Sequence, residues 1–208
     1  MQAYNNNVCD KAIRVQNSDI QESSISVLDM ANAREQKRLV QESLIKKYRE
    51  SLICFSLNIP GPIKVGALYK KVFLLGKTKI ENALSENHFS VLYSLENDYF
   101  TGYEYYAVVA STALSINNLA DERLDFDLST RIKEKMIQVE DETLLSRIFD
   151  IDVIDRTGKK ITRTALNASM RKCFICEHNA YECARSRRHS TEELLARIEK
   201  IIREANIP

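Results

Sequence analysis

The stretch Arg147-Ile148-Phe149-Asp150-Ile151-Asp152-Val153-Ile154 decides the predicted fold, because its apolar and acidic residues alternate strictly. A period of two predicts a β-strand that buries Phe149, Ile151 and Val153 on one face. Asp150 and Asp152 then share the other face about 7 Å apart, where each makes ionisation of its neighbour costly unless a cation binds. Mg²⁺ is the predicted ion, since it binds one or two carboxylates and completes its shell with water and phosphate oxygens. The alternative is the polar face of an ordinary amphipathic strand.

The segment after this strand is basic. Asp155-Arg156-Thr157-Gly158 predicts a hairpin turn, and Lys159 to Leu166 a second strand. From Arg156 to Cys176 the sequence has no acidic residue, although the net charge of the whole chain is only +1. The cations of this basic segment are Arg156, Lys159, Lys160, Arg163, Arg171 and Lys172. Cations beside an acidic pair suit a polyphosphate held from two sides, and a solvated basic surface is the alternative.

The N-terminal part predicts an arm followed by a helix. Residues 1–24 are rich in Asn, Gln and Ser without apolar periodicity, which is typical of a flexible arm. Ser26 is predicted to cap a helix that runs to about Arg49. Arg34, Arg38 and Gln41 form a polar stripe along it that would meet a phosphate or a partner, unless the stripe is simply solvated.

A Pro/Gly turn predicts a further anion site. Leu52 to Ile59 is apolar enough for a buried strand, and Pro60-Gly61-Pro62 ends it. Lys64 follows, just before a predicted helix that begins at Val65. The free N–H groups of that helix start and the Lys64 ammonium would converge on an anion.

Two more strands are predicted, near Phe89 to Leu95 and Tyr103 to Ala110. Glu104 in the second would serve as a further metal ligand or a general base if it faces the Asp pair. Asp125 to Ser129 is predicted to be an irregular break before a helix.

The C-terminal part carries a possible metal-binding pattern, C-x2-C-x6-C-x5-H, formed by Cys173, Cys176, Cys183 and His189. These residues have the donor types of a tetrahedral Zn²⁺ site, with His178 as a competitor for the fourth position. The alternative is reduced cysteines packed as small apolar groups. Ser190 and Glu193 then form a capping box that opens an amphipathic terminal helix.

Composition bounds the fold and the location. The 208 residues are 44% apolar and 28% charged, typical of a soluble protein, and we expect a single α+β domain over residues 25–208. Residues 170–208 would form its Cys/His segment and terminal helix, and helices would flank a mixed or antiparallel sheet. The sequence has no long apolar run and no leader, so we expect neither a membrane span nor secretion. The near-neutral net charge argues against nucleic-acid binding. Five cysteines fit a protein of the reducing cytoplasm.

Several motifs together resemble one family. They are Arg34-Glu35-Gln36, Asn58-Ile59-Pro60-Gly61-Pro62-Ile63-Lys64, Thr101-Gly102-Tyr103-Glu104, Arg147 to Val153, Arg171-Lys172-Cys173-Phe174-Ile175-Cys176 and Cys183-Ala184-Arg185-Ser186-Arg187-Arg188-His189-Ser190. In this order they are similar to motifs of the citrate lyase holo-acyl-carrier-protein synthases, also called apo-citrate lyase phosphoribosyl-dephospho-CoA transferases. The resemblance runs from about Val27 to Ile202, nearly the whole chain.

The resemblance implies a nucleotidyltransferase-type reaction, and the paired Asp residues on a strand suggest a nucleotidyltransferase-like fold. The donor would be triphosphoribosyl-dephospho-CoA, the acceptor a serine of the acyl-carrier (gamma) subunit of citrate lyase, and the leaving group pyrophosphate. Asp150 and Asp152 would hold Mg²⁺, one of them also accepting the serine proton. Arg147, Lys64 and Arg171 would contact phosphate, and Arg34 and Gln41 would bind the donor.

One segment departs from the family. Members usually have His-Pro-Leu-Gly-Arg where this chain has Thr143-Leu144-Leu145-Ser146-Arg147. Loss of the His and the Gly would mean lower activity or another carrier protein. Two alternative functions stay open, a metal-dependent phosphodiesterase or phosphatase and a non-catalytic, zinc-stabilised module that binds a carrier protein.

Overall fold

The computed structural model describes residues 25–110 and 122–207, so the predicted arm of residues 1–24 lies outside the described residues. The α-helices of this part are α1 (Val27–Tyr48), α2 (Ala67–Glu86), α3 (Glu122–Asp141), α4 (Ala180–Ser186) and α5 (Thr191–Glu204). The strands are β1 (Ser51–Leu57), β2 (Ser90–Tyr99), β3 (Gly102–Ala110), β4 (Phe149–Ile154) and β5 (Lys160–Ile161). Two short 3₁₀ turns, η1 (Ser146–Ile148) and η2 (Thr164–Leu166), precede β4 and follow β5.

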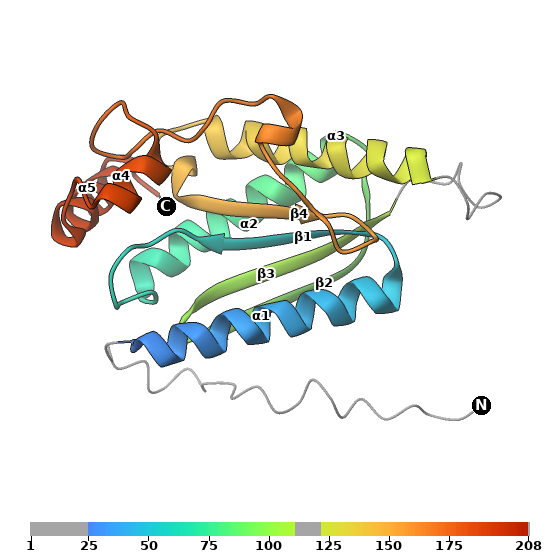
Figure 1. Cartoon of the computed structure of the whole chain (residues 1–208), viewed down its shortest axis with the longest axis horizontal. Helices are drawn as coiled ribbons and strands as arrows, with labels where there is room; N and C mark the ends of the chain where they lie inside the picture. The colour runs from blue at the N-terminus through green and yellow to red at the C-terminus, as the bar shows by residue number, and fades with distance from the viewer. Residues whose placement is uncertain (1–24, 111–121, 208) are drawn as a thin grey trace.

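Among the described residues, the strands form one antiparallel sheet in the order β2-β3-β1-β4-β5. Helix α1 covers one face of it, and α2 and α3 cover the other (Figure 1). The α+β fold with an antiparallel sheet between helices is therefore confirmed. No helix in the described ranges has the length and apolar character needed to cross a bilayer.

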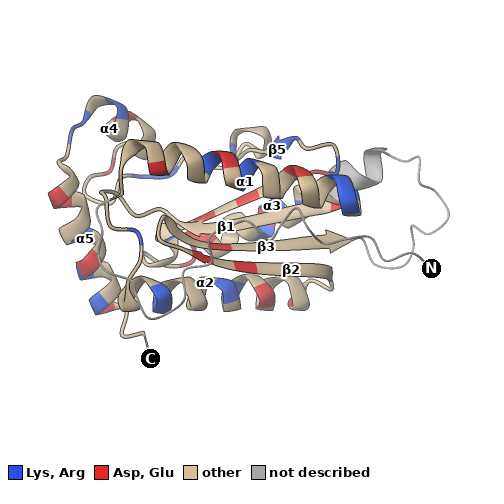
Figure 2. Cartoon of the chain, turned by 90° about the horizontal axis from the view of Figure 1, so that it is seen from below, with Lys and Arg blue, Asp and Glu red and all other residues tan. Residues whose placement is uncertain are grey.

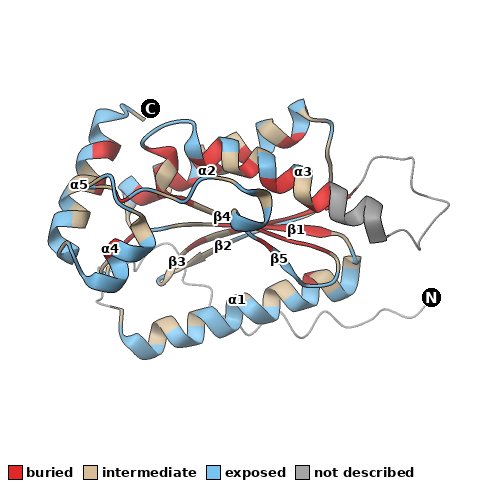
Figure 3. Ribbon diagram, turned by 45° about the horizontal axis from the view of Figure 1, so that its top comes forward, coloured by how far each residue is buried: buried red, intermediate tan, exposed pale blue. Residues whose placement is uncertain are grey.

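The two faces of the sheet are packed unequally (Figure 3). The larger apolar cluster lies between the sheet and α2, α3 and α5, where Phe55 stacks on Phe73 at 5.1 Å between ring centroids. The smaller cluster lies under α1, whose one buried side chain in the described structure is Leu44. Burial of apolar surface under α2 and α3 therefore contributes most of the stability of the sheet.

Local sequence signals set the ends of the helices. The side chain of Ser26 accepts the N–H of Asp29, and the carboxylate of Asp29 accepts the N–H of Ser26, so the predicted start of α1 is confirmed as a capping box. Ser190 and Glu193 form the same motif at the start of α5. After β1 the chain turns at Pro60-Gly61-Pro62, where Gly61 has a φ of +77°, which glycine adopts easily.

Two predictions about elements were wrong. The expected break at Asp125 to Ser129 is absent, because α3 is continuous and buries Leu128, Ile132 and Met136 at helical spacing. The expected strand from Lys159 to Leu166 ends at Ile161. There the side chain of Thr162 accepts the N–H of Ala165, which starts η2 and turns the chain away from the sheet.

Candidate functional site

Three carboxylates lie on the sheet face that α1 covers. Asp150 on β4 is opposite Ser56 on β1, and Ser56 is opposite Glu104 on β3. Asp152 is opposite Cys54, two residues along. Residues directly opposite in antiparallel strands project to the same face, so Glu104 meets the condition that the sequence set for it. Glu104 and Asp150 stand two strand spacings apart, about 10 Å between backbones, with only the small Ser56 between them.

Glu104 is the most enclosed of the three carboxylates. Burial raises the pKa of its carboxyl, which the hydroxyl of Tyr106, donating at 2.6 Å, and the Lys37 ammonium partly offset. Asp150 is more open, with 43% of its side chain exposed. Asp152 is 19% exposed and pairs with the ammonium of Lys160 at 2.7 Å. The cluster therefore has one open carboxylate, Asp150, and two more enclosed ones.

Helix α1 places cations and an amide over these carboxylates. Lys37 Nζ donates to Ser56 Oγ at 3.3 Å, and Gln41 Nε2 donates to Cys54 Sγ at 3.4 Å. Gln41 thus lies over the face that carries the carboxylates, whereas Arg38 of the same predicted stripe pairs with Glu35 and Glu42 on the exposed side. Charges of both signs alternate along this helix (Figure 2).

Lys64 lies just after the Pro60-Gly61-Pro62 turn and near α1. Its ammonium donates to the carbonyl of Ile59 and lies near Arg34, and burial together with that guanidinium lowers its pKa. The side chain of Arg34 belongs to an exposed position of α1. Arg34 and Lys64 thus form a pair of neighbouring cations, one of them on the same helix as Lys37.

The basic segment is mostly neutralised within the protein. Lys160 pairs with Asp152, and Lys172 pairs with Glu177 at 2.6 Å. Arg163 pairs with Glu140 at 2.7 Å and with Asp141 at 2.9 Å. Neither a polyphosphate nor solvent alone therefore accounts for this segment, because Lys160, Arg163 and Lys172 have carboxylate partners within the protein.

Arg171 borders the site, and both Arg171 and Arg147 are held by contacts within the protein. Arg171 bonds to Glu140, and its Nη2 lies 3.7 Å from the Asp150 carboxylate. Arg147 Nη2 donates to the carbonyls of Lys172 and Cys173, and its guanidinium lies 5.5 Å from the ring centre of Phe174. A pocket of about 280 Å³ opens beside Arg171, lined by Thr162, Arg163, Thr164, Met170, Arg171, Asn179, Ala180 and Tyr181.

The departure from the family pattern forms a closed turn. Thr143 Oγ1 lies 2.8 Å from Ser146 Oγ and accepts the N–H of Ser146 at 3.0 Å. Ser146 is fully buried, so the two hydroxyls satisfy each other at the entry to β4. Thr143 and Ser146 therefore stabilise the turn that leads into β4, which carries Asp150 and Asp152.

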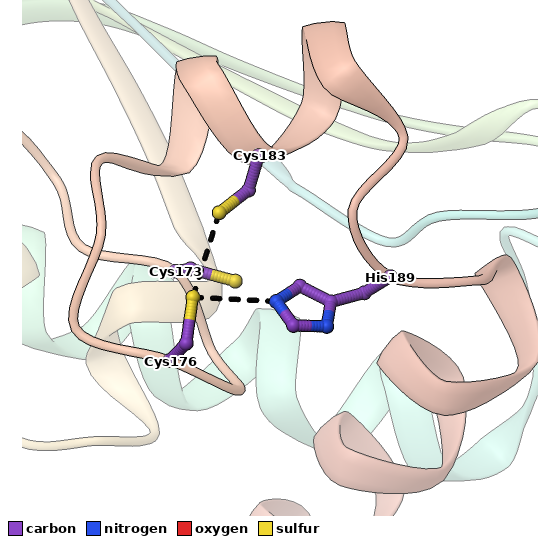
Figure 4. Close-up of side chains that lie close together, drawn as sticks. All are labelled: Cys173, Cys176, Cys183 and His189. Atoms are coloured by element: carbon purple, nitrogen blue, oxygen red, sulfur yellow. Dashed lines mark hydrogen bonds between the residues drawn. The ribbon is translucent and has the colours of Figure 1, made fainter.

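Cys173, Cys176, Cys183 and His189 converge beside α4 (Figure 4). One donor atom from each lies within 4.8 Å of the others. Cys176 Sγ is 3.5 Å from Cys183 Sγ and 3.3 Å from His189 Nε2. His178, the predicted competitor, is exposed and contributes its carbonyl to the N–H of Cys173 instead.

The sequence prediction missed Lys37 and Ser56. Lys37 is three residues after Arg34 and four before Gln41, so helical spacing places it on their stripe in place of Arg38. No sequence pattern marked Ser56, because it lies between Glu104 and Asp150 only once β3 and β4 pair with β1. Cys54 is fully buried beside it, and burial raises the pKa of its thiol to about 12, so it has no reactive thiolate.

Comparison with known proteins covers nearly the whole chain. The sequence profile described as apo-citrate lyase phosphoribosyl-dephospho-CoA transferase matches residues 25–122 and 124–205. A probable apo-citrate lyase phosphoribosyl-dephospho-CoA transferase of Streptococcus pyogenes serotype M3 is 37% identical over 86% of each chain. One of Vibrio cholerae is 31% identical over 84% of this chain and 90% of its own. Protein CitXG of Haemophilus influenzae is 29% identical over 86% of this chain but only 35% of its own length. The chain therefore belongs to the family of apo-citrate lyase phosphoribosyl-dephospho-CoA transferases.

Proposed function

We propose that this protein transfers the phosphoribosyl-dephospho-CoA group from triphosphoribosyl-dephospho-CoA to a serine of the apo acyl-carrier (gamma) subunit of citrate lyase, releasing pyrophosphate. Membership of the family over residues 25–205 carries the proposal. The comparisons do not favour a phosphodiesterase or a non-catalytic binding module. A donor derived from CoA also favours action in the cytoplasm.

The carboxylate cluster supports a nucleotidyltransferase-type mechanism. In this reaction the serine oxygen forms a bond to the phosphorus of the donor while the bond to pyrophosphate breaks, and the serine proton passes to a base. Asp150 is the proposed base, because it is the most exposed of the three carboxylates. Glu104 is sheltered and its pKa is raised, so its role is to complete the anionic cluster.

The residues fit a bound Mg²⁺ through the chemistry of their donors. Carboxylate oxygens of Asp150, Asp152 and Glu104 share a face, with the hydroxyl of Ser56 between them. Release of Asp152 from Lys160 would free one further ligand. When bound there, Mg²⁺ would supply neutralisation of the triphosphate charge.

The cations around the cluster are proposed to hold the donor. The contacts are Arg34, Gln41, Lys64, Arg147 and Arg171, with Lys37 added from the structure. A guanidinium has five N–H donors, so Arg147 and Arg171 keep donors for phosphate beyond their bonds within the protein. The pocket beside Arg171 would receive part of the donor next to Asp150.

The experiment is the intact mass of purified apo acyl-carrier subunit after incubation with the protein, Mg²⁺ and triphosphoribosyl-dephospho-CoA. We expect the carrier to gain the phosphoribosyl-dephospho-CoA mass and pyrophosphate to appear in equal amount. Asp150→Asn/Asp152→Asn is expected to lower the rate by about 100-fold or more while keeping the fold. Glu86→Gln/Glu134→Gln is the matched control, because both carboxylates are exposed and distant from the cluster.

Two results would count against the proposal. Donor hydrolysis that is independent of the carrier would favour a phosphodiesterase. An unmodified carrier, under conditions where an undiverged family member modifies it, would point to the Thr143 to Ser146 turn and to a different carrier.

A further inference from the structure

The Cys/His cluster takes no part in the proposed reaction, and its geometry is that of a metal site. In a tetrahedral site with Zn–S of about 2.3 Å and Zn–N of about 2.0–2.1 Å, donor atoms lie about 3.6–3.8 Å apart. The distances here are 3.5 Å between Cys176 and Cys183 sulfurs and 3.3 Å from Cys176 sulfur to His189 Nε2. A disulfide needs about 2.05 Å between sulfurs, so the thiols are unpaired and available as ligands.

The backbone around Cys173 and Cys176 is built to present their sulfurs. Lys172 and Asn179 form an isolated antiparallel bridge, and Cys173 N–H donates to the carbonyl of His178 at 2.8 Å. These contacts close a tight hairpin loop between Lys172 and Asn179. Within the loop the N–H of Ile175 donates to Cys173 Sγ at 3.5 Å. An N–H donor to sulfur favours a thiolate, the form that binds metal.

The other two donors arrive from separate elements. Cys183 lies on α4, which Asn179 caps by accepting the N–H of Tyr181. His189 lies in the connection to α5, directly before the capping residue Ser190. Capped helix starts on both sides fix where Cys183 and His189 point, so the convergence in Figure 4 comes from three independently positioned segments.

Packing of reduced thiols as apolar groups accounts for only part of this arrangement. Cys173 and Cys183 are 6% and 5% exposed, as buried apolar groups would be. Cys176 and His189 are half-exposed, and apolar packing gives no reason for an imidazole nitrogen to face three sulfurs. Three sulfurs and one nitrogen are soft donors, which select Zn²⁺ over Mg²⁺ or Ca²⁺.

We propose that Cys173, Cys176, Cys183 and His189 bind one Zn²⁺ in a closed, structural site. Four protein ligands leave no open position for substrate, so the ion acts by fixing the hairpin, α4 and the start of α5 relative to one another. That hairpin supplies the carbonyls that Arg147 bonds, and with α4 it supplies Asn179 and Tyr181 to the pocket wall.

The test is metal analysis of the full chain, produced with ample zinc and purified without chelators. Wild type and Cys54→Ala are expected to carry about one zinc per chain, whereas Cys176→Ser and His189→Ala fall below about one tenth. Cys54 is the matched control, because it is a buried thiol on β1 outside the cluster. Wild type refolded with Co²⁺ is expected to show thiolate-to-cobalt charge transfer and the visible bands of tetrahedral cobalt.

The cobalt spectrum decides the matter even if the cluster variants fail to fold. Folded wild type without stoichiometric zinc and without those bands would overturn the site, as would zinc retained by Cys176→Ser. The metal content is measured without donor or carrier, so its failure is separate from failure of the proposed transferase activity.

Discussion

The carboxyl of Glu104 has a raised pKa because it is buried beside Ser56 and Tyr106. When an acid has a higher pKa in the folded than in the unfolded chain, its ionisation costs more free energy in the folded chain. Its contribution to the free energy of unfolding is therefore fully present below the unfolded pKa and is lost as pH rises through the folded pKa. Glu104→Gln keeps an acceptor for the Tyr106 hydroxyl and removes this loss. In Mg²⁺-free buffer we expect its thermal midpoint to exceed that of wild type at neutral pH, with the difference vanishing toward acid. A difference that is constant across pH would refute the assignment.

Glu140 is the second residue on which the site depends. It is 1% exposed, bonds to Arg171 and Arg163, and accepts the N–H of Ile151 at 2.8 Å at the open edge of β4. Glu140→Ala leaves two guanidiniums and a backbone donor without this partner, so we expect a loss of about 3–5 kcal/mol in unfolding free energy. Urea unfolding measures this, with exposed Glu134→Ala expected within about 0.5 kcal/mol of wild type. A loss at Glu140 no larger than that of the control would contradict the described network.

Helix α2 approaches the sheet closely at one position. A Cβ on Gly76 would lie 2.4 Å from Phe55 Cζ and 3.0 Å from Phe149 Cε1. Ala is better than Gly in a helix by about 1 kcal/mol, but overpacking costs about 1–3 kcal/mol. We expect Gly76→Ala to be destabilised in equilibrium unfolding, whereas Ser85→Ala on the exposed side of α2 is neutral or stabilising. A stabilised Gly76→Ala would mean that α2 packs less tightly than described.

At the level of elements, local sequence signals predicted the helix starts and the faces of β4, but they did not predict which strands pair. Capping boxes and apolar spacing located α1 and α5, and alternation placed Asp150 and Asp152 on the polar face of β4. The neighbours of each strand are set by tertiary register, so the sequence alone left the place of Glu104 conditional.

The basic segment shows the same limit for the candidate site. The partner of Arg163 is Glu140, 23 residues earlier, and no local pattern links the two. Charge counting therefore overestimated the free cations after β4 and overlooked Lys37 on α1. Spacing did identify the Cys/His group, because C-x2-C is itself a local geometry.

The molecule as a whole should report ligand binding through its thermal stability. A ligand at about 100 times its Kd stabilises a fold by about 2.7 kcal/mol, and 1 kcal/mol shifts the midpoint of a chain this long by about 2–4 °C. We therefore expect Mg²⁺ with pyrophosphate together to raise the midpoint by about 5–10 °C, and either alone to raise it less. Asp150→Asn/Asp152→Asn should abolish the joint effect, and a joint shift that survives in this variant would place the binding site elsewhere.

Helix α1 lies over the carboxylates, yet Leu44, in its C-terminal half, is its one buried side chain in the described structure. Its first half touches the sheet through polar groups such as Lys37, which exchange easily with water. No residue of that half is buried, so raising it exposes less apolar surface than opening the core, and its free-energy cost is small beside that of unfolding. We therefore expect the donor of the proposed reaction to enter between α1 and the sheet while the core beneath α2 and α3 stays intact.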